Sequence, residues 1–85
     1  LEAGQSKEHT LSPKQALQEF CQGQWSCLPE YVELEARGPS HARAFLVRVH
    51  AAGESFPSAW GRTLKEAEHW AASEALLVLE ERSPA

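Results

Sequence analysis

The chain has 85 residues and a mass of 9.4 kDa, which is enough for one small domain and too little for a second hydrophobic core. Twelve acidic residues, all of them Glu, stand against eight Lys and Arg and give a formal net charge of −4. This balance argues against a protein of the ordinary basic kind that coats polyanions. Hydrophobic residues make up 42% of the chain, a share that supports a packed core and argues against global disorder.

Membrane insertion, secretion and metal binding find little support in the sequence. The longest apolar run, Ala75 to Leu79, is far shorter than the roughly 20 residues that cross a bilayer, and the N-terminus shows no signal-peptide pattern. Cys21 and Cys27 are too few for a disulfide scaffold, and their spacing fits no zinc ribbon. We therefore expect reduced thiols in an intracellular protein of the nucleus or cytoplasm, with no cofactor. A metal site that adds His41 or His50 to the cysteines is a minor alternative.

Residues 1–11 show no periodicity and are expected to form a flexible N-terminal tail. The ordered part begins at Ser12, followed by Pro13, which suits the first helical position, and by Gln15, which completes a capping box. A helix is therefore predicted to start at Pro13 and to end at Gly23. One stripe of its side chains is apolar and is expected to face a core: Ala16, Leu17, Phe20 and Cys21.

Two stretches with period-two alternation follow the helix. Tyr31 to Ala36 predicts a first half-buried strand, which Gly38-Pro39 ends. Ala42 to His50 predicts a second strand, whose inward face is expected to carry Phe45, Val47 and Val49.

A hairpin and a third strand come next. Ala52-Gly53 is typical of a hairpin turn, and Ser55 to Trp60 predicts a third, shorter strand. Pro57 has no N–H to donate to a ladder, so we expect it at the edge of the sheet or at a bulge.

A long second helix closes the domain. Thr63 is the expected N-cap, with Glu66 completing a second capping box, and the helix is predicted to run to about Glu81. Residues 82–85 are expected to form a C-terminal tail, which leaves 12–81 as the domain. The fold class is α+β, with the order α-β-β-β-α and two helices packed on one face of a three-stranded antiparallel sheet. The helical half expected to face the core holds Leu64, Ala67, Ala71, Ala72, Ala75, Val78 and Leu79.

Several spaced motifs accompany this order of elements. They are Pro13-x-x-x-Leu17-x-Glu19, Leu28-Pro29-x-Tyr31, Gly38-Pro39-x-His41-x-x-x-Phe45-x-Val47-x-Val49, and finally Gly61, Ala67, Ala71-Ala72 and Ala75-Leu76. In their joint order and spacing they resemble the double-stranded RNA-binding domain family from Ser12 to Leu79. Members of that family bind A-form RNA by its shape, through three patches that reach two minor grooves and the phosphates between them.

The resemblance assigns the first two patches to polar side chains. Glu19, with Gln18 and Gln15 beside it, would hydrogen-bond ribose 2′-hydroxyls from the first helix, and a merely solvated helix face is an equal alternative. Pro39 and His41, in the loop between the first two strands, would enter the next minor groove. The alternative is a structural turn in which His41 packs back onto the domain.

The third patch departs from the family pattern. Typical members open the second helix with Lys-Lys-x-Ala-Lys, which contacts phosphates across the major groove, whereas this chain has Leu64-Lys65-Glu66-Ala67-Glu68. Lys65 remains, Arg62 can restore one contact, and Glu68 is expected to repel RNA. We therefore expect the affinity to fall by at least about two decades. An acid at this position also resembles the C-terminal domains of some ribonuclease III enzymes.

A second surface points to protein binding. Trp70 and Leu77 lie one heptad apart, on the arc of the second helix opposite its core half, and Trp is enriched at interface hot spots. The alternative is that the C-terminal tail or the loop around Trp25 covers them.

No arrangement of catalytic residues is visible, since the chain lacks Asp, a Gly-rich phosphate loop and an ordered nucleophile and base. The sequence therefore predicts a non-enzymatic double-stranded RNA-binding domain of low affinity within a larger RNA-processing or RNA-regulatory protein. The alternative is a protein-interaction module of the same fold, for dimerisation or partner docking through the outer face of the second helix, that has lost most RNA binding.

Overall fold

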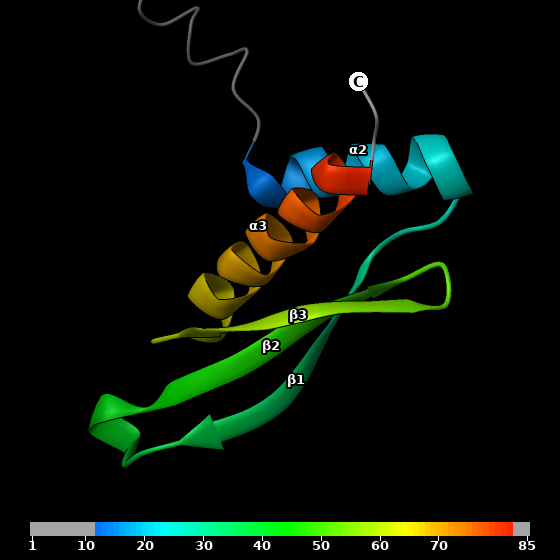
Figure 1. Ribbon diagram of the computed structural model, residues 1–85. Coiled ribbons are helices and arrows are strands. Elements are labelled where there is room, and N and C mark those ends of the chain that lie inside the picture. Colours follow the sequence, from blue (N-terminus) through cyan, green and yellow to red (C-terminus); the bar gives the residue numbers. More distant parts are fainter. Residues whose placement is uncertain (1–11, 83–85) are drawn as a thin grey trace, which may run out of the picture.

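The computed structural model describes residues 12–82 (Figure 1), so the predicted tail 1–11 and residues 83–85 lie outside the described chain. The elements are α2 (Pro13–Trp25), β1 (Glu30–Arg37), a short 3-10 turn (Ser40–Ala42), β2 (Ala44–Ala51), β3 (Glu54–Gly61) and α3 (Leu64–Arg82). The strands form one antiparallel sheet in the order β1-β2-β3. The predicted α-β-β-β-α fold is confirmed.

Both helices lie on the same side of the sheet (Figure 1). α3 packs against β2 and β3, and α2 packs against α3. The core occupies this junction, and alanines on α3 let the helix approach the sheet closely. The buried apolar residues are Leu17, Cys21, Val47, Val49, Ala51, Phe56, Ala67, Ala71, Ala72, Ala75 and Leu79.

α2 begins as predicted and ends later. The Ser12 hydroxyl accepts the N–H of Gln15 at 3.2 Å, and the Gln15 side chain accepts the N–H of Ser12 at 3.3 Å. The predicted end at Gly23 is wrong, because the helix continues to Trp25, whose ring packs edge-on against Phe20 with centroids 5.6 Å apart. This apolar contact favours the two extra residues, and Ser26 takes the left-handed C-cap conformation with φ of 54°.

The sheet follows the predicted alternation with two local changes. β2 starts at Ala44 rather than at Ala42, because the Ala42 N–H donates to the Pro39 carbonyl at 2.9 Å and closes the 3-10 turn. The hairpin turn has positive φ at Ala52 (53°) and Gly53 (77°), as a type I′ turn requires.

Each edge strand carries a bulge. Between β1 and β2 the register shifts between Glu33 and Glu35, so that Leu34 is the extra residue. Between β2 and β3, Ser55 and Ser58 lie opposite His50 and Arg48. Between these pairs β3 advances by three residues while β2 advances by two, and Pro57 lies within this segment of β3. Both expected environments of Pro57, an edge strand and a bulge, are therefore present.

α3 is capped by Thr63, whose hydroxyl accepts the N–H of Glu66 at 3.0 Å. The expected core position of Leu64 is wrong: this side chain is 41% exposed, and the buried positions of α3 begin at Ala67. The helix ends close to the predicted Glu81, at Arg82, which donates to Glu54 at the start of β3 at 3.0 Å.

The contact between β3 and α3 gives a test of stability. A Cβ added at Gly61 would lie 2.7 Å from the Ala67 Cα, so we expect Gly61→Ala to lower the free energy of unfolding by about 2–3 kcal/mol. Gly23→Ala is the matched control, because its Cβ would meet nothing within 4 Å in a helix, and it should leave stability unchanged or raise it by about 0.5–1 kcal/mol. Urea denaturation measures both, and equal midpoints for the two variants would contradict the close packing.

Candidate nucleic-acid interface

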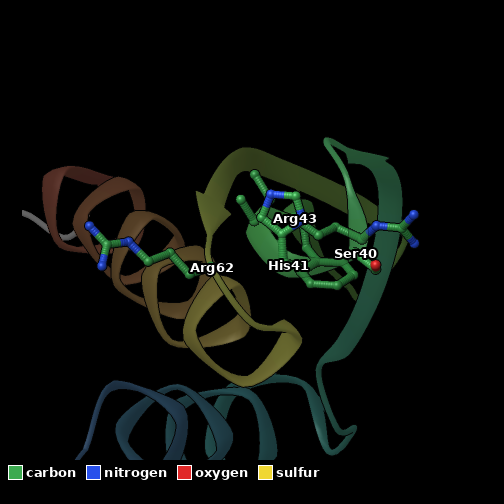
Figure 2. A pocket seen from close by; sticks show the side chains of 7 residues that line it. Ser40, His41, Arg43 and Arg62 are labelled. Carbon is green, nitrogen blue, oxygen red and sulfur yellow. The ribbon is translucent and has the colours of Figure 1, made fainter.

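The three predicted patches belong to elements that meet on one side of the molecule. Figure 1 shows the first turn of α2 (blue), the first turn of α3 (yellow) and the loop between β1 and β2 (green) on the same side. The start of α3 lies between the other two, and Figure 2 shows the same order from close by. An extended ligand that touches all three would therefore cross the start of α3.

The first patch is an exposed polar face of α2. Gln15, Gln18 and Glu19 are all exposed, and their spacing of three and four residues places them on one face of the helix. The Gln15 oxygen accepts the N–H of Ser12, which leaves its NH2 group free to donate. The face offers both donors and acceptors to a polar ligand.

The second patch is the loop from Gly38 to Arg43. Gly38 has φ of 94°, and a Cβ there would lie 2.6 Å from the Ala42 carbonyl oxygen, so the loop requires glycine at this position. Pro39 and His41 are both exposed. The alternative in which His41 packs back onto the domain does not hold in the structure.

Arg43 is a site residue that sequence reasoning missed. Its Nε donates to the Gly38 carbonyl at 3.4 Å, and this hydrogen bond links the two ends of the loop. The Arg43 side chain is exposed. Its position two residues after His41 was the available signal in the sequence. With Ser40, His41, Phe45 and Arg62 it lines a hollow of about 600 Å³ (Figure 2).

Two cationic side chains line the hollow, but their charges do not converge on one point. In Figure 2 the side chains of Arg43 and Arg62 extend in opposite directions from its two sides. Such spacing does not form a cage for one small anion.

The third patch contains two carboxylates that the fold already uses. Glu66 accepts the N–H of Arg62 at 2.5 Å, one residue before the Thr63 N–H that the predicted capping box would use, and so ties the first turn of α3 to the end of β3. Glu68 accepts from Lys14 of α2, with Nζ and Oε1 2.6 Å apart. The expected repulsion by Glu68 therefore needs correction, because a lysine balances its charge, whereas Lys65 and Arg62 are exposed.

Tyr31 lies beneath this ion pair. The Lys14 ammonium sits 5.2 Å from the centre of the Tyr31 ring, and the buried Tyr31 hydroxyl has no hydrogen-bond partner within the described chain. Burial, and then the nearby charge of Glu68, raises the pKa of Tyr31 to about 12.

The outer face of α3 is exposed, as the protein-binding hypothesis requires. Trp70 and Leu77 are 48% and 55% exposed. Trp25 packs on Phe20 and does not cover them, and the predicted tail beyond Arg82 lies outside the described residues.

Trp60 was missed by the sequence reasoning, because simple alternation groups it with the buried Phe56. The bulge between Ser55 and Ser58 shifts the alternation and leaves Trp60 exposed. Trp60 shares a hollow of about 270 Å³ with Trp70, Glu66 and Arg62. The Arg37 guanidinium lies 5.8 Å from the centre of its ring.

Other kinds of site receive no support from residues 12–82. No group of three or more His, Cys, Asp or Glu side chains in this part of the chain is placed to hold a metal ion. Cys21 and Cys27 are free thiols, and burial raises the pKa of Cys21. Neither described helix combines the length and the apolar character that a membrane span needs.

Tyr31 gives a pH-dependent test, because the chain has one tyrosine. Its pKa is raised from 10 to about 12 in the folded state, so the unfolded chain loses this proton first. The free energy of unfolding should fall as the pH rises above about 10. Phenolate absorbance should titrate at higher pH in the folded domain than in urea. Tyr31→Phe should reduce the alkaline loss of stability, part of which remains because the pKa of Cys21 is also raised. Coincident titrations of the folded and unfolded chains would contradict this environment.

Comparisons with known proteins agree with the fold. Residues 13–79 match the family described as double-stranded RNA binding motif. The chain is 42% identical over 73 residues to Ribonuclease 3 of Anoxybacillus flavithermus and 48% identical over 65 residues to that of Caulobacter vibrioides. These alignments cover 86% and 76% of this chain but 31% and 28% of the relatives, so the chain spans less than a third of their length.

Solved structures give the same assignment. The chain superposes on the solution structure of the first double-stranded RNA-binding domain of DRB4 with a TM-score of 0.67 and 37% identity. The match covers 82% of this chain and 97% of that one. Because the family match includes nearly all the described residues, the chain belongs to the double-stranded RNA-binding domain family.

Proposed function

We propose that this domain binds double-stranded RNA by its shape, with low intrinsic affinity, as a non-catalytic module of a larger intracellular RNA-processing or RNA-regulatory protein. The observation that carries the proposal is the placement of the start of α2, the start of α3 and the β1–β2 loop on one side of the molecule (Figure 1). Double-stranded RNA presents minor-groove hydroxyls and phosphates in the same alternation. The relatives named Ribonuclease 3, which are about three times longer, support a larger parent protein.

Each patch has its own role in this proposal. Gln15, Gln18 and Glu19 hydrogen-bond ribose hydroxyls in one minor groove. Pro39 and His41 enter the next minor groove, and Arg43 holds their loop in shape.

Lys65 and Arg62 contact the phosphates between the two minor grooves, where the N-terminal end of α3 also favours negative charge. The low affinity follows from the small number of free cations at this point. Two phosphate contacts predict a salt slope of only about −1.8 in log K against log salt.

A titration against an RNA duplex of about 16 base pairs tests the proposal. We expect saturable binding at low salt that weakens at physiological salt. Arg62→Ala and Lys65→Ala should each reduce affinity about eightfold at 0.1 M salt and lower the slope by about 0.9. His41→Ala should weaken binding without changing the slope, because in this proposal His41 contacts the minor groove and no phosphate.

Arg48→Ala is the matched charge control for this titration. Arg48 alternates along β2 with the buried Val47 and Val49, so it faces away from the helices. It should leave affinity within about twofold of the parent domain. Binding that is absent even at low salt, or equal losses for Arg48→Ala and Arg62→Ala, would overturn the proposal.

The second candidate function is protein binding through the outer face of α3, which the exposure of Trp70 and Leu77 favours. Carboxylates on the same arc, from Glu74 and Glu81, surround these two side chains. Two copies of this face would oppose like charges, so the face fits a partner segment with basic side chains and apolar anchors.

A pair of synthetic amphipathic helices tests this second function. A Lys/Leu peptide should shift the backbone NMR signals around Trp70 and Leu77, and a Glu/Leu peptide of the same length should not. Trp70→Ala should abolish the shifts, since the indole supplies most of the apolar contact. Equal responses to the two peptides, or shifts that survive Trp70→Ala, would remove this function.

A further inference from the structure

We infer that Lys14 is a masked third cation of the RNA interface, which Glu68 withholds from phosphate. This inference rests on the proposed RNA-binding function and concerns its regulation. Glu68 occupies the position where the family pattern has its last lysine. The structure places Lys14 of α2 beside Glu68, already paired with its carboxylate.

The ion pair between Lys14 and Glu68 links α2 to α3 where the two helices meet. Lys14 Nζ and Glu68 Oε1 are 2.6 Å apart, and the two side chains are 38% and 29% exposed. The Tyr31 ring lies against the ammonium at 5.2 Å from its centre. The contacts hold Lys14 at one place while solvent, or a ligand, can still reach it.

This place lies between two of the proposed RNA-binding patches. Lys14 is four residues before Gln18, so the two side chains are neighbours on the surface of α2. Glu68 is three residues after Lys65 and is its neighbour on α3 in the same way. A phosphate strand that passes from Gln18 to Lys65 would therefore cross the ion pair.

The pair is electrically neutral as a unit. An ammonium group has three donors, and Glu68 takes one of them while cancelling the charge that would attract a phosphate. Partly exposed ion pairs of this kind are weakly held, so neutralising the carboxylate would free Lys14 at little cost to the fold. One additional phosphate contact releases about 0.9 counterion, which raises affinity about eightfold at 0.1 M salt.

Titration of the folded domain with the duplex of about 16 base pairs tests the inference. Glu68→Gln should tighten binding about eightfold at 0.1 M salt and steepen the salt slope by about 0.9. In the double variant Lys14→Met with Glu68→Gln, affinity and slope should return to within about twofold of the parent domain. Methionine retains an apolar side chain over Tyr31 and removes the charge.

Glu74→Gln is the matched control, because it removes one acid from α3 on the arc that faces away from α2. It should change affinity by less than about twofold. Equal gains for Glu68→Gln and Glu74→Gln would overturn the inference, as would a double variant that keeps the gain of Glu68→Gln. Thermal unfolding of each variant confirms that the compared domains are folded.

The outcome also separates this inference from the function on which it rests. If the parent domain binds RNA and Glu68→Gln adds nothing, Lys14 is not a masked cation, and the proposed function stands. If no variant shows saturable binding at low salt, the proposed function fails together with the inference.

Discussion

The close approach of α3 to the end of β3 is the constraint on which the rest of the molecule depends. Gly61 lies so near the backbone of Ala67 that no side chain fits between them. This contact fixes where α3 starts, and hence where Arg62 and Lys65 emerge beside the β1–β2 loop. The row of alanines that follows Ala67 continues the approach over β2, and α2 then packs on the far flank of α3. One glycine therefore determines the geometry of both the core and the candidate interface.

The sequence predicted the fold well because local chemistry and tertiary packing agree along most of the chain. Capping residues marked both helix starts, and strand alternation marked the buried Val47 and Val49. The errors lie where side-chain packing overrides a local preference. Gly23 is a common helix end, but the packing of Trp25 on Phe20 carries α2 beyond it.

The candidate site could be predicted in part, for a related reason. Exposed residues in contiguous motifs, such as Pro39 and His41, are visible in sequence because their neighbours define the loop. The role of Glu68 is not visible, because its partner Lys14 is 54 residues away and the pairing exists only after the helices pack. In the sequence, Glu68 looks like the loss of one lysine that would attract phosphate. In the folded chain, α2 supplies a lysine beside this position, and Glu68 is paired with it.

The bulges at Leu34 and Pro57 affect how copies of the domain interact when they lie close together. Both outer strands of the sheet are interrupted, β1 by an extra residue and β3 by a proline. An intact strand edge is a template for recruiting further chains, and an irregular edge is a poor one. Copies packed side by side along one duplex would therefore share their ligand without fusing their sheets, and each would stay free to dissociate alone.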